Sequence, residues 1–218
     1  GDNLTRQPVK SLHELHSRLN SEITIALSPT GEPSGKGIVI TEPDGRISSF
    51  REKPPPELAE SNMANSGIYI CRSSAVSHIE DGSFSDFGLD VFPELLREGR
   101  TLAADTPGGY TRDIGSLENY LLACHDVLSG QVKLNLKPEG MSNGVLIENR
   151  QSYDKIKIRG TLWVQEGATI ESGCFLENCV VLSGAKVRHN SALKNALVLP
   201  DSDVDEGTTA IDKYLSIF

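Results

Sequence analysis

A carboxylate and an ammonium stand side by side at the end of a β-rich run, where Glu52 and Lys53 precede three prolines. A carboxylate can accept hydrogen bonds from sugar hydroxyls, and an ammonium can neutralise a phosphate. Pro54 disfavours a helical backbone at the residue before it, so we expect Lys53 to be extended, with the two side chains pointing to opposite sides of the chain. Taken alone, the tripeptide Glu52-Lys53-Pro54 is more often an ordinary charged strand end without a role in chemistry.

Two aspartates and an asparagine are further candidates for chemistry. Asp2 and Asp113 offer carboxylates at positions far apart in the sequence. Asn65 stands at the mouth of a predicted strand, where its amide can bind a sugar hydroxyl and Gly67 permits a close approach. Alternatively, Asp2 belongs to a disordered terminus, and Asp113 and Asn65 are turn residues.

The strand that ends at Glu52 is half of a predicted hairpin. Two β-rich runs, 37–41 and 46–51, flank the turn sequence Glu-Pro-Asp-Gly over 42–45. Hydrophobic periodicity predicts a helix over 8–20 and another that begins after Ser116 and ends at Gly130. The remaining elements expected in this part are strands over 23–27, 63–71 and 102–104, and short helices after Ser73 and Ser85.

Beyond a boundary expected between residues 137 and 138, the chain repeats. At an offset of 17 residues, aliphatic positions such as Leu176 and Val187 match Leu193 and Val204. Aliphatic residues also recur every six positions, with small residues between them, at Val164, Ile170, Leu176 and Leu182. Three such hexads per turn predict a parallel β-helix of about four coils over 144–212, with these aliphatic side chains stacked inside.

The composition excludes several classes of protein. With 218 residues, a net charge of −9 and no long apolar run, the chain has neither the basic stripe of a nucleic-acid-binding protein nor a membrane span. The four cysteines, at 71, 124, 174 and 179, lack zinc-site spacing, and we expect buried thiols in a reducing cytoplasm.

Five segments, in this order and spacing, resemble the sugar-1-phosphate nucleotidyltransferases, the family of mannose-1-phosphate guanylyltransferases and their glucose-1-phosphate relatives. They are Gly1-Asp2-Asn3, Gly37-Ile38-Val39, Phe50 to Pro54, Asn65 to Tyr69 and Arg112 to Gly115. The resemblance implies an α/β fold, the C-terminal half of a Rossmann-like nucleotidyltransferase domain, over 1–137. It also implies that the hexapeptide-repeat β-helix over 138–218 is left-handed.

The same resemblance implies roles for individual residues. Lys53, Asp2 and Asp113 would be catalytic, with Asp2 and Asp113 close enough to share one Mg²⁺. Gly37, Glu52, Lys53 and Asn65 would bind the substrate. The partners would be a sugar-1-phosphate and a nucleoside triphosphate, and overall appearance suggests mannose-1-phosphate with GTP.

The sequence departs from the family pattern in three places. The family places a glycine-rich nucleotide loop before the Gly-Asp motif, whereas this sequence starts at that motif, so we expect the chain alone to bind nucleoside triphosphate weakly or not at all and to be inactive. Lys36 stands where the family commonly has an aromatic residue, and Thr111 stands where it usually has tryptophan.

Two other functions remain open at this level. One is a noncatalytic regulatory or sugar-phosphate-sensing relative, favoured by the lack of a nucleotide loop. The other is a hexapeptide-repeat acyltransferase, for which His189 would be the base. We also expect a homodimer, formed through an apolar tail that contains Leu215, Ile217 and Phe218.

Overall fold

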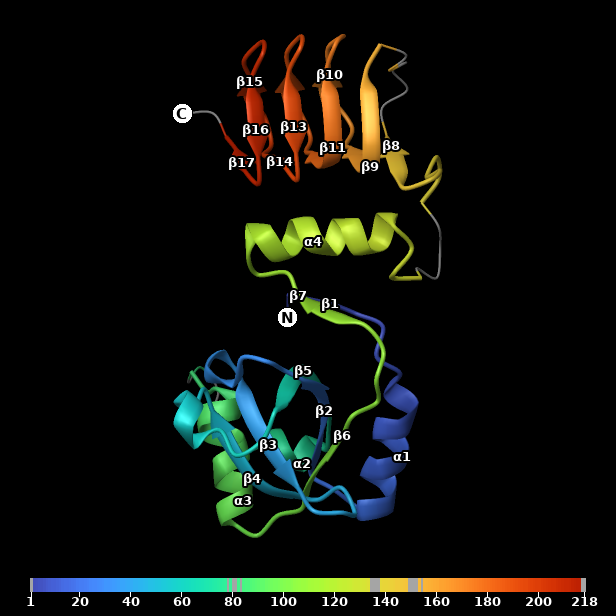
Figure 1. Cartoon of the computed structure of the whole chain (residues 1–218). Coiled ribbons are helices and arrows are strands. Elements are labelled where there is room, and N and C mark those ends of the chain that lie inside the picture. The colour runs from blue at the N-terminus through green and yellow to red at the C-terminus, as the bar shows by residue number, and fades with distance from the viewer. Residues whose placement is uncertain are drawn as a thin grey trace. The chain divides into compact units, whose positions relative to one another are not determined.

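The computed structural model describes residues 2–77, 79, 82, 84–133, 138–148, 153 and 155–216, and the chain forms two compact units. The first unit is Thr5–Thr111, and the second joins Asp2–Leu4 to the chain from Arg112 onward. The first is a mixed α/β unit and the second is dominated by a β-helix (Figure 1). Each has a buried apolar core of its own.

The first unit is built on a five-stranded mixed sheet with the strand order β4-β3-β5-β2-β6. β2 runs parallel to β6, and the other neighbouring strands are antiparallel. The strands are β2 (Ile23–Pro29), β3 (Gly37–Thr41), β4 (Ile47–Glu52), β5 (Met63–Cys71) and β6 (Leu102–Asp105). The helical segments are α1 (Val9–Leu19), η1 (Pro33–Gly35), η2 (Pro56–Leu58), α2 (Ser73–Val76), η3 (Phe87–Val91) and α3 (Phe92–Arg97). The expected hairpin is therefore confirmed as β3 and β4.

Helices cover both faces of this sheet because β2, in its interior, presents apolar or satisfied groups to each side. Ile23, Ile25 and Leu27 alternate onto one face, where they pack with buried residues of α2, η3 and α3. Thr24 points to the other face, and its Oγ1 lies 2.9 Å from Nδ1 of the buried His16 on α1. Figure 1 shows α1 and α3 on opposite sides of the sheet.

A two-stranded sheet, β1 (Asn3–Thr5) with β7 (Thr111–Asp113), contains the division between the units. The helix that follows, α4 (Leu117–Leu128), begins as the sequence predicts, since the hydroxyl of Ser116 accepts a hydrogen bond from the amide of Asn119 at 3.1 Å. Leu121 and Cys124 of α4 pack with Val180 and Leu197 of the β-helix. This packing groups α4 with the second unit, although the boundary expected from composition lies after it, between 137 and 138.

The rest of the second unit is a parallel β-helix, as the sequence predicts. Its strands are β8 (Val145–Ile147), β9 (Lys157–Val164), β10 (Thr169–Ile170), β11 (Phe175–Val181), β12 (Lys186–Val187), β13 (Ala192–Lys194), β14 (Leu197–Val198), β15 (Asp203–Val204), β16 (Thr209–Ile211) and β17 (Tyr214–Leu215). Leu176 pairs with Leu193, and Val187 pairs with Val204. The offset of 17 residues is therefore the length of one coil.

The β-helix turns at rows of residues whose φ is positive. Only glycine adopts this left-handed conformation freely, and asparagine and aspartate tolerate it better than other residues. One row is Gly160, Asn178, Asn195 and Asp212, another is Gly173, Asn190 and Gly207, and a third is Gly167, Gly184 and Asp201. The sequence thus supplies suitable residue types at each turn of the coil.

The predicted interior stack is confirmed at three of its four positions. Val164, Ile170 and Leu176 are buried inside the β-helix. Leu182 was expected among them, and that expectation is wrong, because Leu182 packs with the cluster that includes α4. The cause is the 17-residue coil and the register shift between Glu177 and Cys179, which take the chain out of phase with a strict six-residue period.

The burial of the four cysteines and of the C-terminal apolar residues can be compared with what the sequence predicts. Cys71 is exposed at the end of β5, whereas Cys124, Cys174 and Cys179 are buried as expected. Leu215 lies partly buried against the β-helix interior, while Ile217 and Phe218 fall outside the described residues, so the homodimer contact stays a prediction.

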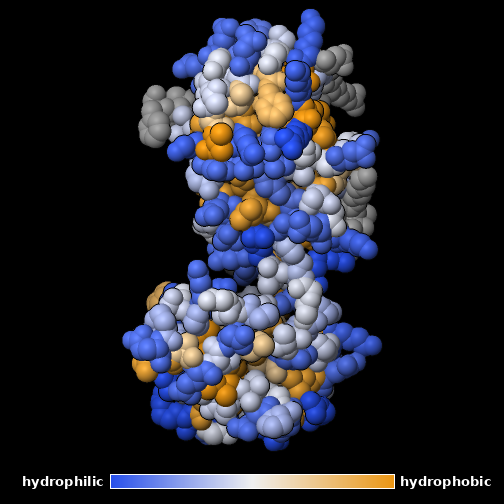
Figure 2. Space-filling view, in the orientation of Figure 1, coloured by the Kyte–Doolittle hydropathy of each residue, from blue (hydrophilic) through white to orange (hydrophobic). Residues whose placement is uncertain are grey.

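On the face shown in Figure 2, hydrophilic residues predominate and hydrophobic ones form separate small groups. Among the described helices, none combines the length and apolar content that crossing a bilayer requires.

Candidate active site

Glu52, the last residue of β4, has its carboxylate enclosed between two glycines of the first unit. Gly37 pairs with Glu52 across the hairpin, and a β-carbon on Gly37 would lie 2.6 Å from Oε2 of Glu52. A β-carbon on Gly88, in η3, would collide with the same oxygen. Any side chain at either position would displace the carboxylate, so the two glycines create the space that Glu52 occupies.

Both oxygens of the Glu52 carboxylate are free to accept hydrogen bonds. Within the described part of the chain, no hydrogen bond or ion pair engages it. Burial raises the pKa of Glu52 above its ordinary value, the nearby Asp86 raises it further, and Lys53 opposes both. A partly desolvated carboxylate without a partner is suited to accept hydrogen bonds from a ligand.

Asp86 and Gly88 are functional candidates that sequence reasoning missed, since the segment around them was interpreted as core packing. Oδ1 of Asp86 caps η3 by accepting hydrogen bonds from the amides of Gly88 at 2.8 Å and Leu89 at 2.9 Å. These bonds hold Gly88 against Glu52. The sequence does contain an indication of this role, because an N-cap aspartate two residues before a glycine predicts a turn at which the backbone approaches another part of the protein closely.

Lys53 does not adopt the extended conformation expected from the following proline. Its φ is 44°, in the left-handed region, and its amide donates to the carbonyl of Lys36 at 3.0 Å. For a residue with a β-carbon this conformation costs about 1–2 kcal/mol. The hairpin causes it, because the bond to Lys36 extends the pairing of Gly37 with Glu52 by one residue and turns the chain there. The Lys53 side chain itself is exposed.

The side chain of Asn65 forms two hydrogen bonds with other residues of β5. Its Nδ2 donates to the hydroxyl of Tyr69 at 2.8 Å, and its Oδ1 accepts from the amide of Gly67 at 2.9 Å. Tyr69 in turn stacks on Phe87 of η3, with ring centroids 5.4 Å apart. One N–H and one lone pair of Asn65 remain for a ligand.

Asp2 and Asp113 converge in the second unit. A β-carbon on Gly115 would lie 2.6 Å from Oδ2 of Asp2 and 3.1 Å from Oδ1 of Asp113. The backbone holds this arrangement, since the amide of Gly115 donates to Oδ1 of Asp113 at 2.7 Å and the amide of Ile114 donates to the carbonyl of Asp2 at 2.7 Å.

This pair of carboxylates fits a magnesium ion. No described lysine or arginine forms an ion pair with either, and the glycine leaves a cradle between them that a side chain would fill. The described residues contain no cluster of three or more potential metal-ligating side chains. Mg²⁺ needs only one or two carboxylates, because water and phosphate oxygens complete its shell.

The structure thus brings the candidate residues together as two groups, Glu52 with Gly37 and Gly88 in the first unit, and Asp2 with Asp113 in the second. His189, the residue of the acyltransferase alternative, belongs to an exposed polar network instead. Its Nε2 lies 3.2 Å from Oε2 of Glu171, and its Nδ1 lies 3.2 Å from Oγ of Ser172.

Comparison with known proteins identifies one family and several relatives. A model of the family described as nucleotidyl transferase matches residues 1–130. The chain is 31% identical over 217 residues to a glucose-1-phosphate adenylyltransferase of Desulfitobacterium hafniense (strain Y51), a match that covers 94% of this chain and 53% of the relative. A glucose-1-phosphate adenylyltransferase of Bacillus cereus (strain ATCC 14579) is 28% identical over 233 residues, covering 95% of this chain and 61% of the relative. The chain therefore spans little more than half the length of these relatives.

Proposed function

Because the chain belongs to the nucleotidyl transferase family, we propose that it acts in the transfer of a nucleotidyl group from a nucleoside triphosphate to a sugar-1-phosphate. The observation that carries this proposal is the Glu52 carboxylate, which is partly desolvated, enclosed by two glycines and without a partner among the described residues. Such a group is of little use to the fold but suits a sugar hydroxyl.

In this reaction an oxygen of the sugar phosphate attacks the α-phosphorus of the triphosphate, and pyrophosphate leaves. Glu52 would accept hydrogen bonds from the sugar, with Gly37 and the remaining amide N–H of Asn65 beside it. The ammonium of Lys53 would neutralise the sugar phosphate, because the left-handed backbone turns this residue away from the strand. Asp2 and Asp113 would hold Mg²⁺, which when bound offsets negative charge on the phosphates.

The identity of the sugar and the base is a finer proposal. The named relatives are glucose-1-phosphate adenylyltransferases, and this favours glucose-1-phosphate with ATP over mannose-1-phosphate with GTP. Nothing in the described residues around Glu52 distinguishes the two sugars, so the preference for mannose stays a prediction to be tested directly.

Calorimetric titration of the chain with glucose-1-phosphate and with mannose-1-phosphate, each with Mg²⁺ present, tests the sugar half of the proposal. We expect Glu52→Gln and Lys53→Ala each to weaken binding about tenfold or more, the effect of losing one charge-assisted hydrogen bond. Glu14→Gln, an exposed substitution on α1, is the matched control. Equal affinity of all three variants, or no binding of either sugar phosphate, would refute the assignment.

A pyrophosphate-release assay with ATP or GTP and either sugar phosphate tests the catalytic half. We expect the chain alone to show little turnover, and Asp113→Asn to remove whatever turnover is present. Strong turnover would overturn the expectation of inactivity and would leave the family assignment intact. Sugar-phosphate binding that needs Glu52 but is never accompanied by turnover would favour the noncatalytic relative.

A further inference from the structure

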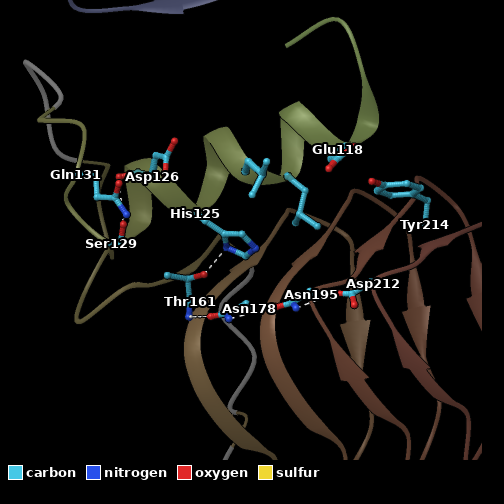
Figure 3. Close-up of a pocket in the computed structure, with 12 residues that line it drawn as sticks. Glu118, His125, Asp126, Ser129, Gln131, Thr161, Asn178, Asn195, Asp212 and Tyr214 are labelled. Carbon is cyan, nitrogen blue, oxygen red and sulfur yellow. Dashed lines mark hydrogen bonds between the residues drawn. The ribbon is translucent and has the colours of Figure 1, made fainter. Parts of the chain in front are cut away.

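A cavity of about 550 Å³ lies inside the second unit, between α4 and one row of turns of the β-helix (Figure 3). This volume falls within the range of small-molecule sites, about 300–1,000 Å³. One face of α4 lines it through Glu118, Leu122 and His125, at the spacing of successive helical turns. None of the residues assigned above to nucleotidyl transfer takes part in it.

The opposite wall of the cavity is a row of hydrogen-bonding side chains. Oδ1 of Asn178 accepts from the amide of Thr161 at 3.1 Å, Nδ2 of Asn178 donates to Oδ1 of Asn195 at 3.2 Å, and Nδ2 of Asn195 donates to Oδ1 of Asp212 at 2.8 Å. Successive members come from successive coils, about 4.8 Å apart. Each asparagine keeps one N–H and one lone pair, so the row offers evenly spaced donors and acceptors.

The charge of the cavity limits what can bind there. None of the described residues that line it is a lysine or an arginine. Glu118 and Asp212 contribute carboxylates, while the carboxylate of Asp126 is already paired with Arg112 at 2.9 Å. A phosphate would meet uncompensated negative charge here, whereas hydroxyl groups can donate to the free carboxylate oxygens.

His125 adds a polar atom that lacks a partner. Its Nδ1 lies 2.5 Å from Oγ1 of Thr161, and its Nε2 is buried without a hydrogen bond to any described residue. Burial lowers the pKa of His125, opposed by Asp126, so the imidazole is neutral near pH 7. Nε2 is closed off from solvent, so a ligand must move the atoms around it to reach it and would then satisfy it.

The open end of the cavity combines an apolar ring with a carboxylate. Figure 3 shows the hydroxyl end of Tyr214 pointing toward Glu118 at this end, while Asp212 lies at the end of the row that contains Asn178 and Asn195. Tyr214 and Leu122 are 42% and 39% exposed, so both can contact a ligand. An aromatic face next to hydrogen-bonding groups suits a ring that has apolar faces and polar edges.

We propose that this cavity binds an uncharged sugar of one or two rings, without a phosphate group. The row of amides and the two carboxylates would bind its hydroxyls, Tyr214 and Leu122 would contact a ring face, and Nε2 of His125 would hydrogen-bond to one hydroxyl. The ligand is therefore chemically distinct from the sugar-1-phosphate of the proposed reaction, and the site stands whether or not that reaction is correct.

Nuclear magnetic resonance of the 218-residue chain, with isotope-labelled histidine side chains, tests the proposal with maltose as the probe. Maltose should shift the His125 imidazole signals in a saturable manner and should leave those of His13, on the exposed surface of α1, unchanged. Glucose-1-phosphate should shift His125 far less at the same concentration, because the cavity is acidic.

Two exposed substitutions, Tyr214→Ala and Glu118→Gln, should each weaken maltose binding about tenfold or more, the effect of one lost hydrogen bond or ring contact. Asp212→Asn keeps a residue that tolerates the left-handed backbone and should weaken binding without unfolding the β-helix. Glu94→Gln, on the surface of α3, is the control. The proposal is overturned if maltose leaves His125 unshifted, if the cavity variants bind as the control does, or if glucose-1-phosphate binds there more tightly than maltose.

Discussion

The two units differ at one position in their use of left-handed backbone, because Lys53 is the one described residue with positive φ that is not glycine, asparagine or aspartate. In the β-helix, the residues at positive φ are glycine, asparagine or aspartate, and the side chains of Asn178, Asn195 and Asp212 also hydrogen-bond from coil to coil. In the first unit, Lys53 has a φ of 44° although lysine gains nothing from that conformation. Strain that residue type does not relieve is concentrated at functional sites in proteins. The difference is consistent with the sugar-phosphate-binding role proposed for Lys53.

The largest expected effect concerns the interior that the repeat builds. Leu176→Ala should lower the free energy of unfolding of the second unit by about 2–5 kcal/mol, because Leu176 is fully buried and its truncation leaves a cavity. Ile158, its pairing partner in the neighbouring coil, is 38% exposed, so Ile158→Ala is the matched control and should cost much less. Urea denaturation measures both. Similar losses would show that the interior stack does not dominate stability.

Next in size is the row of turns. Asn195→Ala should lower the free energy of unfolding by about 2 kcal/mol, since it combines a left-handed alanine with two lost side-chain hydrogen bonds. Asn195→Gly loses the same hydrogen bonds but relieves the backbone, and should cost less. Thermal unfolding of the two variants separates the contributions. If alanine and glycine prove equal, residue type at the turns matters only through its hydrogen bonds.

Acid should weaken the two units through one partly or fully buried histidine each. Burial lowers the pKa of His16 in the first unit and of His125 in the second from the ordinary value of 6.5. A neutral imidazole is thus favoured in the folded state, so its stabilising contribution is complete above pH 6.5 and is lost as pH falls from there toward the folded pKa. The loss is about 1.4 kcal/mol for each unit by which the pKa is lowered.

Denaturation between pH 5 and 8 measures this loss, with His16→Gln and His125→Gln as separate variants. Each should flatten the pH dependence of the unit that contains it. His13→Gln, on the exposed side of α1, should change the profile of the first unit much less than His16→Gln, because the charge of His13 contributes less than burial to the lowered pKa of His16. A pH dependence that survives both substitutions would assign the acid sensitivity to other groups.

The smallest effect tests the strain at Lys53. Lys53→Gly should raise the free energy of unfolding by up to about 1 kcal/mol, because glycine relieves the left-handed backbone at some cost in chain entropy. It should also weaken sugar-phosphate binding as strongly as Lys53→Ala, which keeps the strain. Melting temperature and calorimetry on the two variants give both quantities. If glycine is no more stable than alanine, the strain at this position is negligible.

Much of the local structure follows from the sequence by itself. The apolar spacing over 117–128 and the cap at Ser116 predict α4, and the Pro-Asp-Gly turn predicts the β3–β4 hairpin, because hydrophobic period and turn chemistry depend on neighbours in the chain. The offset of 17 residues predicts the coil of the β-helix, since each coil repeats the same packing against the next. Glu52 and Asp113 could be identified as candidates because each belongs to one of the five short segments that resemble the family in the same order along the chain.

Only the tertiary structure decided which of these residues meet. Gly88 comes against Glu52 from a segment far along the chain, and Leu182 turns outward toward α4. His125 pairs through Nδ1 with Thr161, while its Nε2 is buried without a partner among the described residues. The backbone of Lys53 is likewise set by its bond to Lys36 across the hairpin, against the preference of the residue before a proline. Each outcome depends on side chains distant in sequence competing for one space, and a periodic pattern contains no information about that competition.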